Sequence, residues 1–250
     1  MANSILTVRE LRSGYGRIPI LFGLDLTVEE GEFVSVLGHN GMGKTTFLRT
    51  LTGHLKTTGG QVKLDERDIT EASPTDRARA GIGYVPQGRQ IFPALSVLEN
   101  LRMGALQLEK RERAPKIESI LEDFPRLKPI LGRTGGVLSG GEQQILAIAR
   151  CLAGSPRLVL LDEPTEGIQP SIIAEIQDVL RRLTSHHRLS VVLVEQNLEL
   201  IRSVARRIFI IRKGRLSAAI RPDQLEDKSA IDEFVGLGDS NHEPGRSSLC

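Results

Sequence analysis

A glycine-rich loop at residues 38–45 limits the folds open to this chain more than any other feature of the sequence. The loop reads Gly-His-Asn-Gly-Met-Gly-Lys-Thr and fits the pattern G-x-x-x-x-G-K-T in full. The apolar run Phe33–Leu37 comes directly before it. Apolar residues follow it at helical spacing: Phe47, Leu48, Leu51 and Leu55. A strand, a glycine loop and a helix in this order predict a phosphate-binding loop, because glycines let successive backbone N–H groups point at one anion.

The lysine and the threonine of this loop have separate expected roles. Lys44 would bridge the terminal phosphates of a nucleotide, and the Thr45 hydroxyl would ligate Mg²⁺. The alternative is an ordinary glycine turn with a surface lysine, and the flanking strand and helix argue against it. We expect the following residues to bind ATP here: Gly38, His39, Asn40, Gly41, Met42, Gly43, Lys44, Thr45 and Thr46.

The apolar pattern of the rest of the chain predicts an α/β fold. Short runs at 158–161, 191–194 and 208–211 indicate strands buried on both faces, as in a parallel sheet. Near the N-terminus, Leu24, Leu26 and Val28 alternate with polar residues, which indicates a half-exposed strand. A helical face is formed by Ile145, Ile148, Ala149 and Leu152. We therefore expect a P-loop NTPase core with a mostly parallel sheet, an N-terminal antiparallel β portion and an inserted α-helical subdomain.

The insert is expected at about residues 88–155. No strand-like run occurs from residue 88 to about 138, whereas residues 96–103 and 116–124 have helical patterns. We predict one nucleotide-binding domain over residues 1–235, with this helical subdomain inside it. Residues 236–250 are rich in Gly, Ser, Asn and Pro, and we expect them to form a disordered tail.

Composition excludes several other classes of protein. The formal net charge is only +2, and without a long basic run this argues against a nucleic-acid partner. The two cysteines, Cys151 and Cys250, do not suggest a disulfide framework, so a reducing cytosol fits. No apolar stretch approaches the ~20 residues that a spanning helix needs, and the N-terminus does not resemble a signal peptide. If the protein works at a membrane, another chain must do the spanning.

Two carboxylates end the strand predicted at 158–161. In α/β folds ligands bind at the carboxyl edge of the sheet, which is where Asp162 and Glu163 would lie. We expect Asp162 to support Mg²⁺, directly or through water, and Glu163 to polarise the attacking water. Acids in this position are often solvated turn residues, so the motif gains its weight from the phosphate-binding loop.

The segment Leu-Ser-Gly-Gly-Glu at 138–142 resembles the signature sequence of a known family. With the loop and the acids, it makes the chain resemble the ATP-binding subunits of ABC transporters along nearly its whole length. In that family the signature opens a helix and closes over the γ-phosphate that the opposite subunit holds. The resemblance therefore implies a dimer in which two ATP molecules are sandwiched. It also implies that four residues bind the partner's ATP: Ser139, Gly140, Gly141 and Glu142.

Other positions match elements of the family in order. Tyr15 corresponds to the aromatic residue that stacks on adenine, with a surface tyrosine as the alternative. Gln87 corresponds to the glutamine that touches Mg²⁺ and links the core to the helical subdomain. Gln169 stands where most relatives have an acid in the loop that contacts the other subunit. That replacement puts the cross-dimer contact in doubt.

The largest departure follows the strand predicted at 191–194. Most relatives have a histidine there that contacts the γ-phosphate, whereas this chain reads Glu-Gln-Asn at 195–197. His186 and His187 precede the strand, at its far end. An amide can donate a hydrogen bond but cannot shuttle a proton, so we interpret Gln196 as a group that positions rather than titrates. The catalytic residues expected from the sequence are Lys44, Glu163 and Gln196.

The same departure narrows the family resemblance. Glu-Gln-Asn at 195–197, with Thr-Glu-Gly-Ile-Gln-Pro at 165–170, is similar to ATPases of importers for branched-chain amino acids or urea, with the urea type favoured. This implies integral-membrane permease subunits, a second ATP-binding subunit and, indirectly, a periplasmic or extracellular substrate-binding protein. The protein would then sit in the cytoplasm on the inner face of the plasma membrane.

Three alternatives carry weight. A GTPase would need an Asn-Lys-x-Asp motif, which is absent. A lipopolysaccharide-export ATPase would keep the histidine that Gln196 replaces. A non-transport ABC protein that acts as a regulatory or scaffolding module stays open, although such proteins usually carry two cassettes or long coiled-coil inserts.

Overall fold

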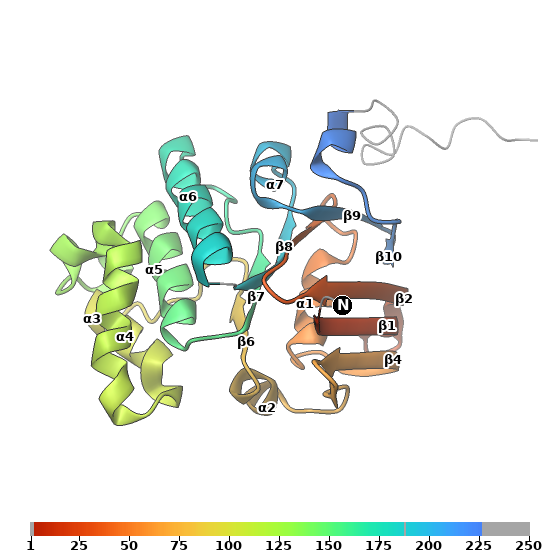
Figure 1. Ribbon diagram of the computed structural model, residues 1–250, viewed down its shortest axis with the longest axis horizontal. Coiled ribbons are helices and arrows are strands. Elements are labelled where there is room, and N and C mark those ends of the chain that lie inside the picture. Colours follow the sequence, from red (N-terminus) through yellow and green to blue (C-terminus); the bar gives the residue numbers. More distant parts are fainter. Residues whose placement is uncertain (1–2, 188, 227–250) are drawn as a thin grey trace, which may run out of the picture.

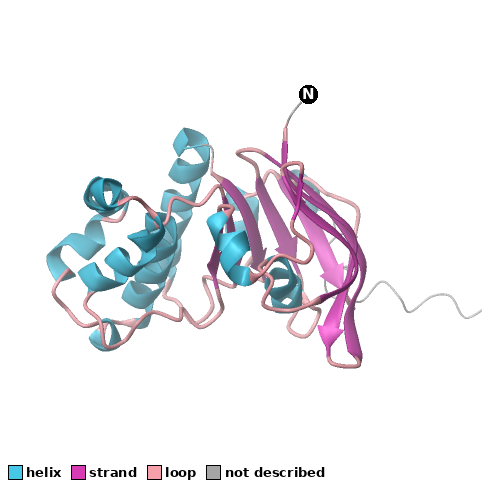
Figure 2. Cartoon of the chain, turned by 90° about the horizontal axis from the view of Figure 1, so that it is seen from below, coloured by secondary structure: helices cyan, strands magenta, loops and turns pink. Residues whose placement is uncertain are grey.

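The computed structural model describes residues 3–187 and 189–226, so the tail predicted at 236–250 lies outside the described residues. Two sheets and a group of helices make up this part of the chain (Figure 1). Helices α3, α4 and α5 gather at one end, and strands β1, β2 and β4 lie at the other, as both ribbon views show (Figures 1 and 2). The predicted α/β class is confirmed.

A six-stranded sheet of the order β10-β9-β3-β8-β7-β6 forms the centre. All neighbours in it are parallel except β9 and β10. Its strands are β3 Phe33–Leu37, β6 Ile82–Val85, β7 Leu158–Asp162, β8 Ser190–Glu195, β9 Arg207–Arg212 and β10 Arg215–Leu216. Strands β3, β7 and β8 are buried along their whole length, as their apolar runs predict. Because β8 lies between β3 and β7, the loops that follow these three strands meet at one edge of the sheet.

A second, antiparallel sheet of the order β2-β1-β4-β5 covers one face of the first. Its strands are β1 Ser4–Tyr15, β2 Ile18–Glu29, β4 Thr57–Leu64 and β5 Arg67–Asp68. Leu24, Leu26 and Val28 are buried and the residues between them are exposed, so the predicted half-exposed strand and the antiparallel N-terminal portion are confirmed.

Helices supply the rest of the core. The α-helices are α1 Lys44–Leu51, α2 Pro74–Arg79, α3 Val97–Gly104, α4 Lys110–Asp123, α5 Gly140–Ala153, α6 Pro170–His187 and α7 Leu198–Val204. Short 3₁₀ helices are η1 Ala105–Gln107, η2 Pro125–Ile130, η3 Gly135–Val137 and η4 Pro222–Glu226. Alternate residues of one strand pack on opposite sides: Leu193 joins the cluster under α5 and α6, whereas Val192 and Val194 join the cluster under α1 and the antiparallel sheet.

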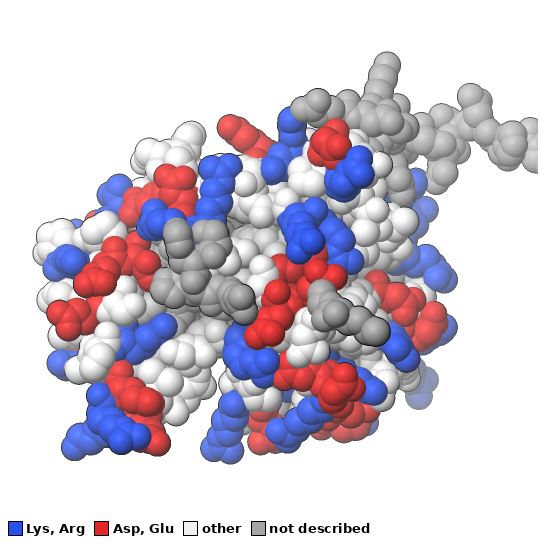
Figure 3. Space-filling model, in the orientation of Figure 1, with Lys and Arg blue, Asp and Glu red and all other residues white. Residues whose placement is uncertain are grey.

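The segment between β6 and β7 holds α3, α4 and α5 and no named strand, as expected for a helical insert. One helical prediction was wrong in its extent. Leu55 does not continue the face of Phe47, Leu48 and Leu51, because α1 ends at Leu51 and Gly53 turns the chain with φ 77°. Within the described residues, no helix is long and apolar enough to cross a membrane. Acidic and basic side chains are interspersed over the face in Figure 3.

Candidate nucleotide-hydrolysis site

The glycine-rich loop joins the end of β3 to the start of α1, as predicted. Gly43 adopts φ 104°, which a side chain would disfavour. At Gly38 a Cβ atom would lie 2.5 Å from Cγ2 of Ile211, so this position has no room for one. Among the described residues, the backbone N–H groups of Gly41, Gly43 and Lys44 have no hydrogen-bond acceptor. Together with Asn40, Thr45 and Thr46, these residues line a cavity of about 400 Å³, and free donors around such a cavity fit a phosphate chain.

Lys44 lies deep in this loop, with only 4% of its surface exposed. Its Nζ donates to the carbonyl oxygens of Gly38 at 2.6 Å and His39 at 2.9 Å. It also forms an ion pair with Glu163, whose Oε1 lies 2.7 Å away. These three partners use all the N–H bonds of the ammonium group. The structure thus links the loop directly to the end of β7.

Asp162 is the last residue of β7 and is 1% exposed. Its Oδ1 accepts from the Thr45 hydroxyl at 3.2 Å, and its Oδ2 accepts from the Tyr84 hydroxyl at 3.1 Å. Burial raises the pKa of Asp162 to about 6; these two hydrogen bonds oppose the rise and Glu163 adds to it. Burial and then Asp162 raise the pKa of Tyr84, so this hydroxyl stays protonated and donates. Sequence reasoning missed Tyr84, whose signal was a single tyrosine in a short apolar run.

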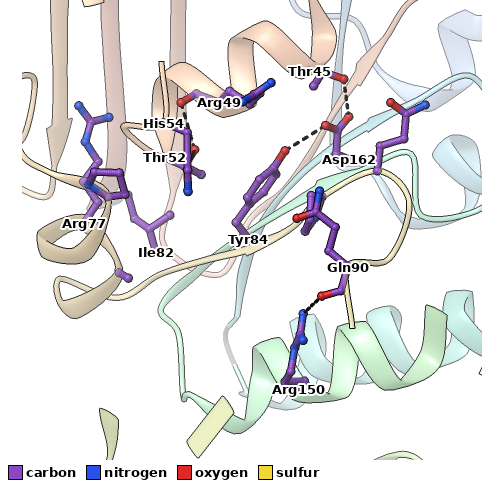
Figure 4. A pocket seen from close by; sticks show the side chains of 14 residues that line it. Thr45, Arg49, Thr52, His54, Arg77, Ile82, Tyr84, Gln90, Arg150 and Asp162 are labelled. Carbon is purple, nitrogen blue, oxygen red and sulfur yellow. Dashed lines mark hydrogen bonds between the residues drawn. The ribbon is translucent and has the colours of Figure 1, made fainter. Parts of the chain in front are cut away.

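A second cavity, of about 580 Å³, borders the site on the far side of Asp162 (Figure 4). Tyr84, Asp162 and Thr45 form one wall, and Gln90 and Arg150 form another. Arg150 of α5 donates through Nη2 to the carbonyl oxygen of Gln90 at 2.7 Å. This cavity is therefore lined both by the end of the glycine-rich loop and by helix α5.

Gln196 follows β8, and its side chain contacts Glu163 and the glycine-rich loop. Its Nε2 donates to Oδ1 of Asn40 at 2.9 Å and to Oε2 of Glu163 at 3.2 Å. Each oxygen of Glu163 therefore has one donor, Lys44 on Oε1 and Gln196 on Oε2. The amide of Gln196 therefore joins the Glu163 carboxylate to the glycine-rich loop by hydrogen bonds.

Gln87 lines both cavities. Its Nε2 donates to Oε2 of Glu166 at 2.8 Å, which ties it to the loop after β7. Met42 packs against the core, and the carbonyl oxygen of His39 accepts from the Met42 N–H at 3.3 Å as well as from Lys44. Tyr15 ends β1 with 43% of its surface exposed and does not line the loop cavity.

The signature lies apart from these groups, at the start of α5. Ser139 Oγ accepts from the Glu142 N–H at 3.3 Å, and Glu142 Oε2 accepts from the Ser139 N–H at 2.7 Å, a capping box. Ser139, Gly140, Gly141 and Glu142 line a cavity of about 280 Å³ with Gln169, and it shares no residue with the loop cavity. The glycine loop and the signature therefore line two separate cavities in one chain.

Comparison with known protein families agrees with the resemblance seen in the sequence. The family model described as ABC transporter matches residues 21–166, more than half of the 250-residue chain. The chain belongs to the ABC transporter family.

Three relatives illustrate the range of this family. The high-affinity branched-chain amino acid transport ATP-binding protein BraG of Pseudomonas aeruginosa is 36% identical over 212 residues, covering 85% of this chain and 91% of the relative. The probable branched-chain amino acid transport ATP-binding protein LivF of Archaeoglobus fulgidus is 34% identical over 213 residues, covering 85% and 90%. The lipopolysaccharide export system ATP-binding protein LptB of Haemophilus influenzae is 34% identical over 240 residues, covering 94% and 98%.

Solved structures agree with the fold. The ADP conformation of MJ1267, an ATP-binding cassette of an ABC transporter, superposes with a TM-score of 0.83 at 26% identity, covering 93% of this chain and 99% of that one. The dimeric structure of MJ0796, a bacterial ABC transporter cassette, gives 0.78 at 27% identity, covering 87% and 98%. This ABC protein is thus an ATP-binding and ATP-hydrolysing cassette of the P-loop NTPase fold, as the sequence resemblance implies. None of these names mentions urea, so the preference for a urea-type subunit is unsupported.

The buried Asp162 carboxyl predicts a pH effect on the stability of the nucleotide-free, metal-free protein. Its folded pKa of about 6 exceeds the ordinary value of 3.8, so between pH 4 and 6 the folded state keeps a proton that the unfolded state loses. Stability from this group therefore falls as pH rises, by on the order of 3 kcal/mol in total. Asp162→Asn carries no charge, and urea denaturation should show it gaining about 2 kcal/mol of this total on wild type between pH 4.5 and 7. A constant difference between the two proteins would contradict the burial argument.

Proposed function

We propose that this chain is the ATP-hydrolysing subunit of an ABC importer for branched-chain or other hydrophobic amino acids. The names of BraG and LivF support the substrate class, and the Glu-Gln-Asn sequence at 195–197 supports the import type. We propose residues 1–235 as one nucleotide-binding domain, with a helical subdomain at about 88–155. The observation that carries the catalytic part is the contact of one carboxylate, Glu163, with both Lys44 and Gln196.

In the proposed mechanism Lys44 leaves Glu163 to hold the terminal phosphates, while the N–H groups of Gly41 and Gly43 orient them. Glu163 then takes a proton from the attacking water at the oxygen that Lys44 has released. Gln196 keeps the other oxygen in place through its amide. The chain's own contribution is therefore positioning and charge.

Three oxygen-bearing side chains fit Mg²⁺, a cation that prefers oxygen ligands. Thr45 and Asp162 already contact each other at 3.2 Å, and Gln87 lines the same loop cavity as Thr45. We propose that these three residues hold the ion, directly or through water. The ion would supply positive charge against the phosphate oxygens when bound.

The separate place of the signature supports a head-to-tail dimer, with Ser139, Gly140, Gly141 and Glu142 serving the partner's ATP. The solved structure of MJ0796, a cassette of similar fold, is dimeric. Tyr15, exposed at the end of β1, is free to meet adenine at the open side of the loop. ATP binding would favour the closed dimer and hydrolysis would release it.

The helical subdomain is our proposed docking face for integral-membrane permease subunits at the inner face of the plasma membrane. Four large apolar side chains are exposed there: Phe92 at 42%, Met103 at 41%, Leu106 at 51% and Val137 at 66%. The guanidinium carbon of Arg150 lies 4.8 Å above the centre of the Phe92 ring. Arg150 also lines the second cavity. A substrate-binding protein outside the membrane would take part only indirectly.

A second candidate is a lipopolysaccharide-type export ATPase, favoured by the relative LptB, which matches 94% of this chain. The amide at Gln196, where the family resemblance implies a histidine, favours import. Copurification with membrane subunits separates both from a regulatory or scaffolding ABC module, because only a transporter subunit should bring down integral-membrane partners.

Replacing Glu163 by Gln tests the proposed base. The variant should bind ATP but lose roughly two to four orders of magnitude in kcat, the usual worth of a general base. It should also collect as ATP-bound dimers in gel filtration. The matched control Glu118→Gln, on the exposed face of α4, should keep wild-type turnover. Near-normal hydrolysis by Glu163→Gln would contradict the assignment of Glu163 as the general base.

Mixing two inactive variants tests the composite site. Lys44→Ala inactivates a chain's own loop and Ser139→Arg inactivates its signature, so a heterodimer of the two keeps one intact site of two. In an equal random mixture half of the dimers are heterodimers, and ATPase activity should reach about a quarter of wild type. Each parent alone should be inactive. Heterodimers shown to form without any recovered activity would mean that one chain builds the whole site.

A further inference from the structure

Glu195 is a buried carboxylate to which the proposed mechanism gives no role. It ends β8, is 3% exposed, and pairs in register with Leu37 of β3. Among the described residues no lysine or arginine forms an ion pair with it. A buried charge of this kind needs hydrogen-bond donors in place of a cation.

Four donors surround this carboxylate, and they come from two different loops. Oε1 accepts from the backbone N–H of Thr165 at 3.0 Å and from the Thr165 hydroxyl. Oε2 accepts from the backbone N–H groups of Gln196 at 2.7 Å and Asn197 at 3.0 Å. Each oxygen therefore serves one loop, and hydrogen bonds to a charged acceptor are the strong ones.

The two loops carry the groups that meet at the candidate site. Thr165 lies two residues after Glu163 and one before Glu166, which accepts from Gln87. On the other side, Gln196 directs its amide to Glu163 and Asn40. The loop that carries Gln196 and the loop that carries Glu163 are thus joined twice. The Gln196 amide contacts Glu163 directly, and the Glu195 carboxylate accepts from the backbone of both loops.

We propose that Glu195 is a positioning residue, whose carboxylate ties the turn at 196–197 to the loop at 163–169 and so keeps the Gln196 amide on Glu163. The proposal rests on the proposed function for its kinetic consequence. The isosteric amide of Glu195→Gln breaks the arrangement on one side only. Its oxygen can still accept, but its NH₂ group would face donors. Because the tie between the two loops needs both carboxylate oxygens, losing one side should loosen both loops while strand β8 itself is kept.

The experiment combines steady-state kinetics with hydrogen exchange on the full-length protein. For Glu195→Gln we expect kcat to fall at least tenfold, while affinity for a fluorescent ATP analogue stays within about twofold, since the hydrogen bonds of the Glu195 side chain go to Thr165, Gln196 and Asn197. Amide exchange should become faster in both segments, 163–169 and 195–200, without nucleotide present. Glu199→Gln, exposed in the first turn of α7, is the matched control and should change none of these values.

A double-mutant cycle separates positioning from a general loss of stability. If Glu195 acts through Gln196, the kcat losses of Glu195→Gln and Gln196→Ala should combine to clearly less than their product. Thr165→Val removes one donor without touching the carboxylate. It should loosen both segments in the same way and carries the test if Glu195→Gln does not fold.

Unchanged kcat in folded Glu195→Gln, or faster exchange in only one of the two segments, would overturn the proposal. Fully multiplicative losses in the cycle would also overturn it. An inactive wild type or a fully active Glu163→Gln would instead overturn the proposed function, and the exchange measurement would still decide whether Glu195 joins the two loops.

Discussion

The buried ion pair of Lys44 and Glu163 is the interaction on which the rest of the site depends. Removing one member of such a pair leaves an uncompensated charge, at a cost of about 3–5 kcal/mol. Lys44 opens α1 and Glu163 follows β7, so the pair joins two segments that are far apart in sequence. The parallel order of β3, β8 and β7 makes this contact possible, because it brings their carboxyl ends to one edge. Nucleotide phosphates would compete with Glu163 for Lys44, which couples binding to release of the base.

Around this pair, two carboxylates and one amide hold the neighbouring loops by hydrogen bonds. Asp162 collects hydroxyl donors from Thr45 and Tyr84, whereas Glu195 collects donors from the two loops beside it. Gln196 contacts Glu163 without carrying a charge of its own. In the proposed mechanism Gln196 therefore acts by position, and the charge beside it comes from neighbouring carboxylates.

The sequence predicted the parts of this arrangement that follow from local pattern. Glycine spacing marked the loop at 38–45, and apolar runs marked β3, β7, β8 and β9 because each strand is buried on both faces. Strand β6 was missed, since Gly83 and Tyr84 interrupt its apolar residues. The contacts of Tyr84 with Asp162 and of Thr165 with Glu195 join residues 78 and 30 positions apart. Such contacts depend on the order of strands in the sheet, which no local pattern gives.

The most direct test of the central ion pair is the affinity for a non-hydrolysable ATP analogue, measured by calorimetry. Because Glu163→Gln frees Lys44 from a charged partner, the account predicts that this variant binds the analogue roughly tenfold or more tightly than wild type. In a Lys44→Ala background the same substitution should give a clearly smaller gain, because no lysine is left to be released. Unchanged or weaker binding by Glu163→Gln in the presence of Lys44 would contradict the account.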